Sequence, residues 1–216
     1  MIESEGVLLV FTKTPEPGKT KTRLIPALGE EGAAKLHRLL LRNTLKQALR
    51  SQFFNVELWC TPSTEHPFLN ECQYKFAVKL CRQEGDNLGQ RMHNALLSAL
   101  TRYPFAVIIG SDCPVLTVNV LNQAYEKLQQ GIDAVIGPSE DRGYYLIGAR
   151  KNDESLFKDI QWGSHDVADM TRVKLSTLGW RWDELNILWD VDMPEDLEKL
   201  RNNRPDLLRG LEAEPV

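Results

Sequence analysis

The sequence predicts an α/β fold, a three-layer α/β/α sandwich built around a mostly parallel, mixed sheet. Short apolar runs rich in β-branched and aromatic residues alternate with stretches of helical spacing, which is typical of βαβ crossovers. Two of the runs lie too close together for a crossover helix, so we expect them to pair antiparallel. The 216 residues, 42% apolar and 26% charged, favour one domain spanning residues 1–216.

Each expected element follows from the local pattern of apolar residues. Strand-like runs occupy residues 7–11, 54–60, 76–80, 105–109, 134–136 and 144–147. Apolar residues at helical spacing occupy 36–49, 88–99 and 118–128, followed by a helix through Val167, Met170 and Val173 and a last helix from Pro194. Residues 207–216 are expected to fray as a terminus. In such folds ligands gather beyond the carboxyl ends of the strands, so motifs at those positions carry the functional argument.

Composition excludes several classes of function. A net charge of −4, with the basic residues dispersed along the chain, argues against a nucleic-acid partner. The apolar run at the start of the chain is too short to span a bilayer and no cleavable leader precedes it, so we expect a cytoplasmic protein. The cysteines form no CxxC pair, which predicts reduced thiols rather than a zinc site or disulfides: Cys60, Cys72, Cys81 and Cys113.

The segment from Phe11 to Leu24 is the most informative local signal. It is a Pro/Gly loop that carries four cations directly after the first expected strand. A flexible glycine lets backbone N–H groups approach an anion, and Lys and Arg add charge-assisted hydrogen bonds to phosphate oxygens. The loop matches neither the Walker nor the dinucleotide glycine pattern. It is therefore a phosphate-loop candidate, and a solvated basic loop is the alternative.

Two acidic positions are candidate ligands for Mg²⁺ or Mn²⁺. Asp112 follows the expected strand 105–109, and Asp192 belongs to an Asp-x-Asp pattern that opens the last helix. Mg²⁺ binds one or two carboxylates together with substrate phosphates and water, so a converging pair would suffice. The alternative for each is a helix cap, since both precede a proline that can start a helix.

Two further segments are polar turns. Residues 83–92 form a glycine-containing turn ahead of a helix, able to contact a base or ribose, and this local pattern is weak. Residues 137–148 form a turn before a strand with adjacent tyrosines, which should face opposite sides of the sheet. The four histidines occur singly, and we interpret them as surface or core residues.

Five segments together resemble a known family. In order along the chain they are KTPEPGKTKTRL, GDNLGQRM, IGSDCPVL, GPSEDRGYYLIGA and DVDMPEDL. From Val7 to about Leu200 the chain resembles an uncharacterised bacterial family of the glycosyltransferase-A superfamily, which comprises the nucleotide-diphospho-sugar transferases. The functional relatives of that family include 2-phospho-L-lactate guanylyltransferase and molybdenum cofactor guanylyltransferase.

This resemblance implies roles for individual residues. Contacts to the nucleotide would come from Lys13, Gly18, Lys21, Arg23, Asp86, Gly89 and Arg91. Asp112 and Asp192 would hold the metal, and Asp141, Gly143 and Tyr144 would lie on the acceptor side. Lys21, Arg23 and Asp112 would be the catalytic residues. The family usually has Asp-Gly-Gly-Tyr-Tyr, and Arg142 in place of the first glycine would narrow the acceptor pocket or recruit an anionic acceptor.

Three functions remain open from the sequence. The leading hypothesis is metal-dependent nucleotidyl transfer from a nucleoside triphosphate to a small phosphorylated acceptor, with release of pyrophosphate, because the dense cations suit a triphosphate. The first alternative is glycosyl transfer from a nucleotide-sugar, with Asp141 or Glu140 as the acceptor base. The second alternative is a nucleotide-binding protein without catalytic turnover.

Overall fold

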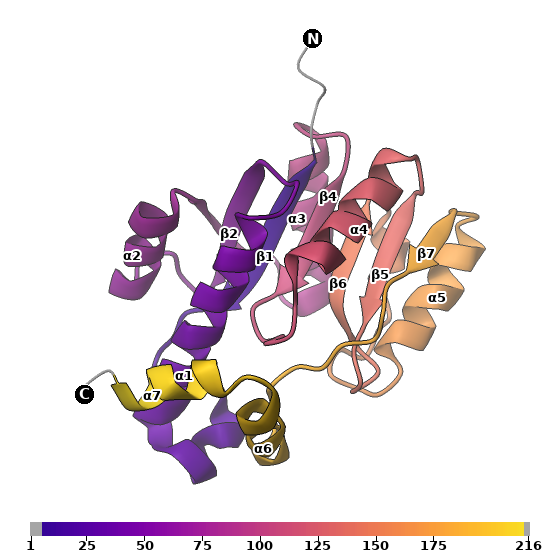
Figure 1. Ribbon diagram of the computed structural model, residues 1–216. Helices are drawn as coiled ribbons and strands as arrows, with labels where there is room; N and C mark the ends of the chain where they lie inside the picture. Colours follow the sequence, from indigo (N-terminus) through magenta and orange to yellow (C-terminus); the bar gives the residue numbers. More distant parts are fainter. Residues whose placement is uncertain (1–5, 214–216) are drawn as a thin grey trace.

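The computed structural model describes residues 6–213, which form a sheet of seven strands covered by helices (Figure 1). The strands are β1 (Val7–Lys13), β2 (Asn55–Thr61), β3 (Lys79–Arg82), β4 (Ala106–Gly110), β5 (Ala134–Pro138), β6 (Tyr144–Ala149) and β7 (Trp182–Glu184). The α-helices are α1 (Ile25–Ala48), α2 (Pro67–Phe76), α3 (Leu88–Leu100), α4 (Val118–Gln129), α5 (Val167–Thr177), α6 (Pro194–Asn203) and α7 (Pro205–Ala213). Two short 3₁₀ helices are η1 (Thr22–Leu24) and η2 (Glu154–Leu156).

The sheet is mixed, as expected. Its strand order is β3-β2-β1-β4-β6-β5-β7, and among these described strands β6 alone runs antiparallel, to both of its neighbours β4 and β5. The predicted antiparallel pairing of the runs 134–136 and 144–147 is therefore confirmed. Because β1 and β4 are adjacent and parallel, the loops that leave their carboxyl ends begin at the same edge of the sheet.

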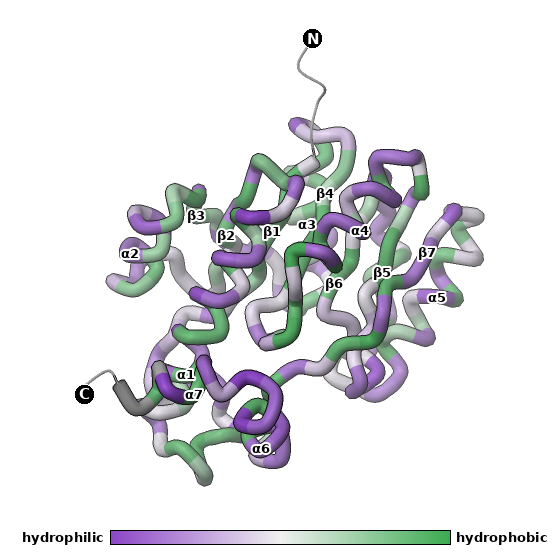
Figure 2. The backbone as a smooth tube through the Cα atoms, in the orientation of Figure 1, coloured by the Kyte–Doolittle hydropathy of each residue, from purple (hydrophilic) through white to green (hydrophobic). Residues whose placement is uncertain are grey.

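Two apolar layers hold the helices against the sheet. One face packs Leu8 and Val10 of β1 against α1, α2 and α4. The other face packs Val7 and Leu9 of the same strand against α3 and α5. Side chains alternate along a strand, so one buried strand serves both layers, and the α/β/α sandwich follows. In Figure 2 the strands β4 and β5 are largely hydrophobic, whereas α6 is largely hydrophilic.

A third cluster attaches the end of the chain to its beginning. Leu36 and Leu40 of α1 pack with Trp189, Val191 and Leu200 from the C-terminal segment. Figure 1 shows α6 and α7 beside the first part of α1. This packing carries the segment between β7 and α6 back across the molecule, toward the loop that follows β1.

Some expected elements were wrong in detail. The run 76–80 is not one strand, because Phe76 ends α2 and β3 begins at Lys79. That helix was missed, although His66 accepts a hydrogen bond from the Phe68 amide and Pro67 occupies the first turn. Within 207–213 the terminus is helical and does not fray, since Leu207 is buried against α1; residues 214–216 lie outside the described residues.

The predicted helix after Ser164 is confirmed as α5, but its buried face is different. Met170 and Val173 are exposed, whereas Leu175 is fully buried against the sheet. The short strand β7 was also missed. Its three residues are all half-buried, so they give neither an apolar run nor a clear alternation.

Across residues 6–213, none of the helices combines the length and the apolar character that crossing a bilayer requires. All four cysteines are free thiols, as predicted, and three of them are buried.

The register of α5 can be tested with a pair of substitutions. Leu175→Ala should lower the free energy of unfolding by about 2–5 kcal/mol, because it leaves a cavity in the core. Val173→Ala, two residues away and 65% exposed, should change it by less than about 0.5 kcal/mol. Urea denaturation measures both values. Equal losses for the two variants would contradict the observed orientation of this helix.

Candidate active site

A cleft of about 510 Å³ opens at the carboxyl ends of β1 and β4. The loop after β1, the end of β4, the start of α3 and the connection between β6 and α5 all contribute to its lining. Five of the residues predicted for the site line it: Lys13, Lys21, Arg91, Asp112 and Asp192. Its position agrees with the rule that open α/β sheets bind ligands at this edge.

Lys21 lies between the two predicted metal ligands. Its Nζ is 2.9 Å from Asp112 Oδ2 and 3.8 Å from Asp192 Oδ1, and its side chain is only 3% exposed. The residue has φ 51° and ψ 43°, a left-handed conformation that costs about 1–2 kcal/mol outside glycine. Such strain is typical of functional sites, where surrounding contacts offset it. Of the four cations in the basic loop, Lys21 is therefore buried beside the acids, whereas Lys13, Lys19 and Arg23 are exposed.

Backbone hydrogen bonds at Val191 bring Asp192 to Asp112. The Val191 amide donates to Asp112 O at 3.0 Å, and Val191 O accepts a hydrogen bond from Lys21 Nζ. Val191 itself is fully buried in the cluster that joins α1 to α6. Two acids eighty positions apart in the chain are thus held at one place by apolar packing and main-chain bonds.

Neither candidate acid serves as a helix cap. Helix α4 is capped by Thr117, whose side chain accepts from the Val120 amide, so Asp112 is left to the cleft. At α6, Asp196 Oδ2 accepts from the amides of Asp192 and Met193. The side chain of Asp192 turns instead to Lys21 and to Arg23, whose Nη1 lies 2.7 Å from Asp192 Oδ2.

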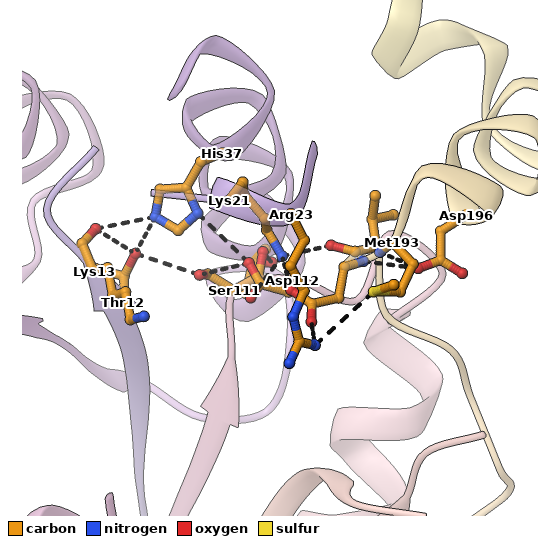
Figure 3. Close-up of polar contacts among 12 residues, drawn as sticks. Thr12, Lys13, Lys21, Arg23, His37, Ser111, Asp112, Met193 and Asp196 are labelled. Atoms are coloured by element: carbon orange, nitrogen blue, oxygen red, sulfur yellow. Dashed lines mark hydrogen bonds and ion pairs between the residues drawn. The ribbon is translucent and has the colours of Figure 1, made fainter. Parts of the chain in front are cut away.

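His37, in the middle of α1, is a site residue that sequence reasoning missed. Its Nδ1 lies 3.5 Å from Asp112 Oδ1, and its Nε2 lies 3.0 Å from both Thr12 Oγ1 and Lys13 O. The ring is buried and lines the cleft. Figure 3 shows the row of contacts from Lys13 through His37 to Asp112 and Lys21. The contact is tertiary, so no local pattern indicates it.

These neighbours keep Asp112 ionised. Burial raises the pKa of its carboxyl, but the Lys21 ammonium and the His37 ring outweigh burial and lower that pKa well below its usual range. A carboxylate that stays charged in a partly buried position is suited to hold a cation.

Asp190 is the second residue that sequence reasoning missed, although it begins the same Asp-x-Asp pattern. It is half-buried, and burial together with the charges of Asp112, Asp141 and Asp192 raises its pKa to about 7 against the opposing effect of Lys21. Burial and the neighbouring carboxylates thus keep Asp190 protonated to a higher pH than an exposed acid.

The other residues predicted to contact the nucleotide, Asp86, Gly18 and Gly89, do not line the cleft. Asp86 is exposed in a smaller adjoining recess that shares Arg91 with the cleft. Gly18, with φ 75° beside Glu30, lies outside the lining of the cleft. Gly89 also lies outside it, behind Trp162: a Cβ there would come within 2.7 Å of the Trp162 ring. Trp162 itself lines the cleft and was not singled out from the sequence.

The residues predicted for the acceptor side lie beyond the lining of the cleft. Asp141 Oδ1 accepts from Ser139 Oγ and from the Gly143 amide, which closes the turn before β6. Tyr144 and Tyr145 pack on opposite faces of the sheet, as expected. The Tyr144 ring packs edge-on against Trp162, at 6.4 Å between centroids.

Arg142 takes φ 66°, a conformation in which the glycine usual in the family would be unstrained. It lines a separate surface recess with Asp169 and Arg172. Whether Arg142 narrows an acceptor pocket or recruits an anionic acceptor stays a prediction.

The donor set fits a hard divalent cation. Oxygens of Asp112 and Asp192 lie within 2.9 and 3.8 Å of the same Lys21 nitrogen, so both reach one cationic centre. Their side chains remain 39% and 50% exposed, which leaves room for water and substrate oxygens. Mg²⁺ is usually bound in this way, by one or two carboxylates, phosphates and water. No group of three or more His, Cys, Asp or Glu ligands occurs in residues 6–213, which does not favour an all-protein metal cage.

Comparison with solved structures identifies the fold as that of the nucleotide-diphospho-sugar transferases. A protein from Desulfovibrio desulfuricans G20, assigned to that class, is 32% identical with a TM-score of 0.85, covering 97% of this chain and 96% of its own. The inositol-1-phosphate CTP transferase from T. maritima is 9% identical with a TM-score of 0.62, covering 99% of this chain and 98% of its own. Rv0371c from Mycobacterium tuberculosis H37Rv, solved in complex with manganese, is 14% identical with a TM-score of 0.53, covering 92% of this chain and 99% of its own.

Residues 44–164 match the family described as "Uncharacterized protein conserved in bacteria (DUF2064)", and the chain belongs to that family. No curated protein sequence matches it. The predicted membership of an uncharacterised bacterial family in this superfamily is thereby confirmed.

Because the pKa of Asp190 is raised, replacing this residue by neutral asparagine should increase Tm by an amount that depends on pH. A carboxyl whose folded pKa exceeds its unfolded value stabilises the fold when protonated, and that contribution is lost as the pH rises from about 4 to about 7. Asp190→Asn should therefore raise Tm at pH 8 and change it little at pH 4, by about 2–4 °C for each kcal/mol of repulsion removed.

Thermal unfolding of both proteins at the two pH values measures the effect. Asp133→Asn is the opposite control, because Lys151 and the Arg181 amide lower the pKa of Asp133, so its loss should lower Tm at pH 8. If Asp190→Asn raised Tm equally at pH 4 and pH 8, the raised pKa of Asp190 would be contradicted.

Proposed function

We propose that this protein is a metal-dependent transferase that uses a nucleotide donor, and that it transfers a nucleotidyl group from a nucleoside triphosphate to a small phosphorylated acceptor. The observation that carries the proposal is the convergence of Asp112, Asp192 and the Lys21 ammonium in one cleft that also exposes Lys13 and Arg91. A site with acids for a metal and cations for phosphates suits a polyphosphate.

The charged residues at the cleft have distinct roles in this reaction. Lys13, Lys21 and Arg91 hold the triphosphate, and Arg23, beside Asp192, stabilises the charge that develops on the leaving pyrophosphate. Asp112 and Asp192 hold Mg²⁺ or Mn²⁺, which when bound polarises the α-phosphate as a Lewis acid. His37 keeps the Asp112 carboxylate oriented toward the cleft. An acceptor phosphate attacks the α-phosphorus, the bond to the β-phosphate breaks, and pyrophosphate leaves with the electron pair.

The comparisons support this choice of chemistry. The T. maritima neighbour is named for transferring from CTP to inositol-1-phosphate, a phosphorylated acceptor, and the Mycobacterium tuberculosis neighbour was solved with manganese. A phosphate acceptor is already ionised at neutral pH, so the reaction requires no protein base. The two acids in the lining of the cleft, Asp112 and Asp192, are both paired with Lys21, so neither is offered as such a base.

Glycosyl transfer from a nucleotide-sugar is the second candidate, because the 32% identical neighbour is assigned to the nucleotide-diphospho-sugar transferases. An inverting glycosyltransferase would require a carboxylate base at the acceptor. Both proposed bases have other partners. Asp141 Oδ1 accepts a hydrogen bond from the Gly143 amide within the turn before β6, and Glu140 pairs with Lys199 at 2.5 Å. These contacts favour the nucleotidyl reaction.

Pyrophosphate release distinguishes the candidates. With Mg²⁺, a panel of nucleoside triphosphates and small phosphorylated acceptors should give acceptor-dependent pyrophosphate, measured by a coupled phosphate assay. Release of nucleoside diphosphate from a nucleotide-sugar panel, without pyrophosphate from the first panel, would overturn the nucleotidyl reaction in favour of glycosyl transfer. If no nucleotide binds with Mg²⁺ in a thermal-shift screen, the transferase proposal itself is wrong.

Asp112→Asn tests the metal site directly. Replacing the carboxylate by an amide removes one anionic ligand, so Mn²⁺ affinity in the presence of nucleotide should fall by about tenfold or more. Isothermal titration measures it. Asp169→Asn, an exposed acid paired with Arg172 on α5, is the matched control and should leave the affinity unchanged. Unchanged Mn²⁺ affinity in Asp112→Asn would refute the role of Asp112.

A further inference from the structure

The Lys21 ammonium occupies the position between the two carboxylates that a metal ion would take. Its Nζ is 2.9 Å from Asp112 Oδ2 and 3.8 Å from Asp192 Oδ1, and it donates a hydrogen bond to Val191 O. The first and third contacts are of hydrogen-bond length, and the contact with Asp192 is a longer ion pair. In the ligand-free protein the Lys21 ammonium is therefore paired with the two acids.

We propose that Lys21 is a resident counter-ion that makes metal binding depend on nucleotide binding. The inference rests on the proposed function, because it assigns the metal and the polyphosphate to this cleft. Lys21 and Arg23 balance the charges of Asp112 and Asp192, so a free divalent cation meets a pair of acids that is already neutralised. An entering polyphosphate accepts the ammonium and frees both carboxylates for the metal.

The coupling has a physical basis in the fold. A divalent cation and a buried ammonium a few ångströms apart repel each other strongly, because water screens them little. The Lys21 side chain is only 3% exposed, so in the ligand-free protein its ammonium lies beside the acids and not in solvent. A polyphosphate removes the repulsion by giving the ammonium an anionic partner. By linkage, the metal must then strengthen polyphosphate binding by the same factor.

The adjacent cation in the loop provides a contrast. Lys19 is 77% exposed and pairs with Glu16 at 2.6 Å, away from both acids. The same loop thus contains one solvated lysine and one that neutralises the metal site, and only the second should affect the metal.

The test is a titration with Mn²⁺ alone, followed by electron paramagnetic resonance, on the wild type and Lys21→Met. Removing the ammonium should raise nucleotide-free Mn²⁺ affinity by about tenfold or more. Lys19→Met makes the same change in net charge and should leave the affinity within about twofold of the wild type. Equal or weaker Mn²⁺ binding by Lys21→Met would overturn the proposal.

A second variant is needed in case Lys21→Met does not fold, which circular dichroism would detect. Lys21→Gln is neutral but keeps amide donors for Val191 O and Asp112, and it should show the same gain in Mn²⁺ affinity. Thermal shifts with Mn²⁺ and inorganic tripolyphosphate, separately and together, test the coupling. In the wild type the joint shift should exceed the sum of the separate shifts, and in the neutral variants it should equal the sum.

Failure of this proposal and failure of the proposed function are distinguishable. The titration with Mn²⁺ alone needs neither turnover nor nucleotide, so it decides the role of Lys21 even if no triphosphate binds. Conversely, pyrophosphate release by a wild type whose nucleotide-free Mn²⁺ affinity is unaffected by Lys21→Met would leave the function standing and refute the counter-ion.

Discussion

The contact of the Lys21 ammonium with Asp112 and Asp192 is the interaction on which the site depends. Like charges so close together are costly unless a cation lies between them, and a buried lysine is costly unless it is paired. The ammonium and the two carboxylates therefore offset each other's electrostatic cost at the edge of the sheet. The same arrangement provides acids for a metal and a cation for a phosphate, which are the two requirements of nucleotide-dependent transfer.

The rest of the fold maintains that contact. The adjacent strands β1 and β4 bring the basic loop and Asp112 to one edge, and a third apolar cluster packs the C-terminal segment against α1. Val191 then joins the two through its amide and its carbonyl. The stability of α6 and its packing on α1 are thus linked to the geometry of the site, although α6 contributes no residue to the lining of the cleft.

Much of this arrangement could be predicted from the sequence, because strand alternation and motifs at strand ends are local signals. The layers and the antiparallel pair follow from them. The convergence of Lys21, Asp112 and Asp192 was a hypothesis from the motifs, and their place in one cleft comes from the tertiary structure. His37 could not be predicted, since its role comes from a contact between a helix interior and a distant loop. Asp190 was passed over because the raised pKa results from burial and neighbouring charges, which the spacing alone does not encode.

The central claim is most directly tested by a crystal structure of the wild type with Mn²⁺ and inorganic tripolyphosphate, in which anomalous scattering locates the metal. The account predicts Mn²⁺ bonded to one oxygen each of Asp112 and Asp192, with Lys21 Nζ moved onto a phosphate oxygen. Manganese bound elsewhere, with the Lys21 ammonium still between the two carboxylates, would contradict it.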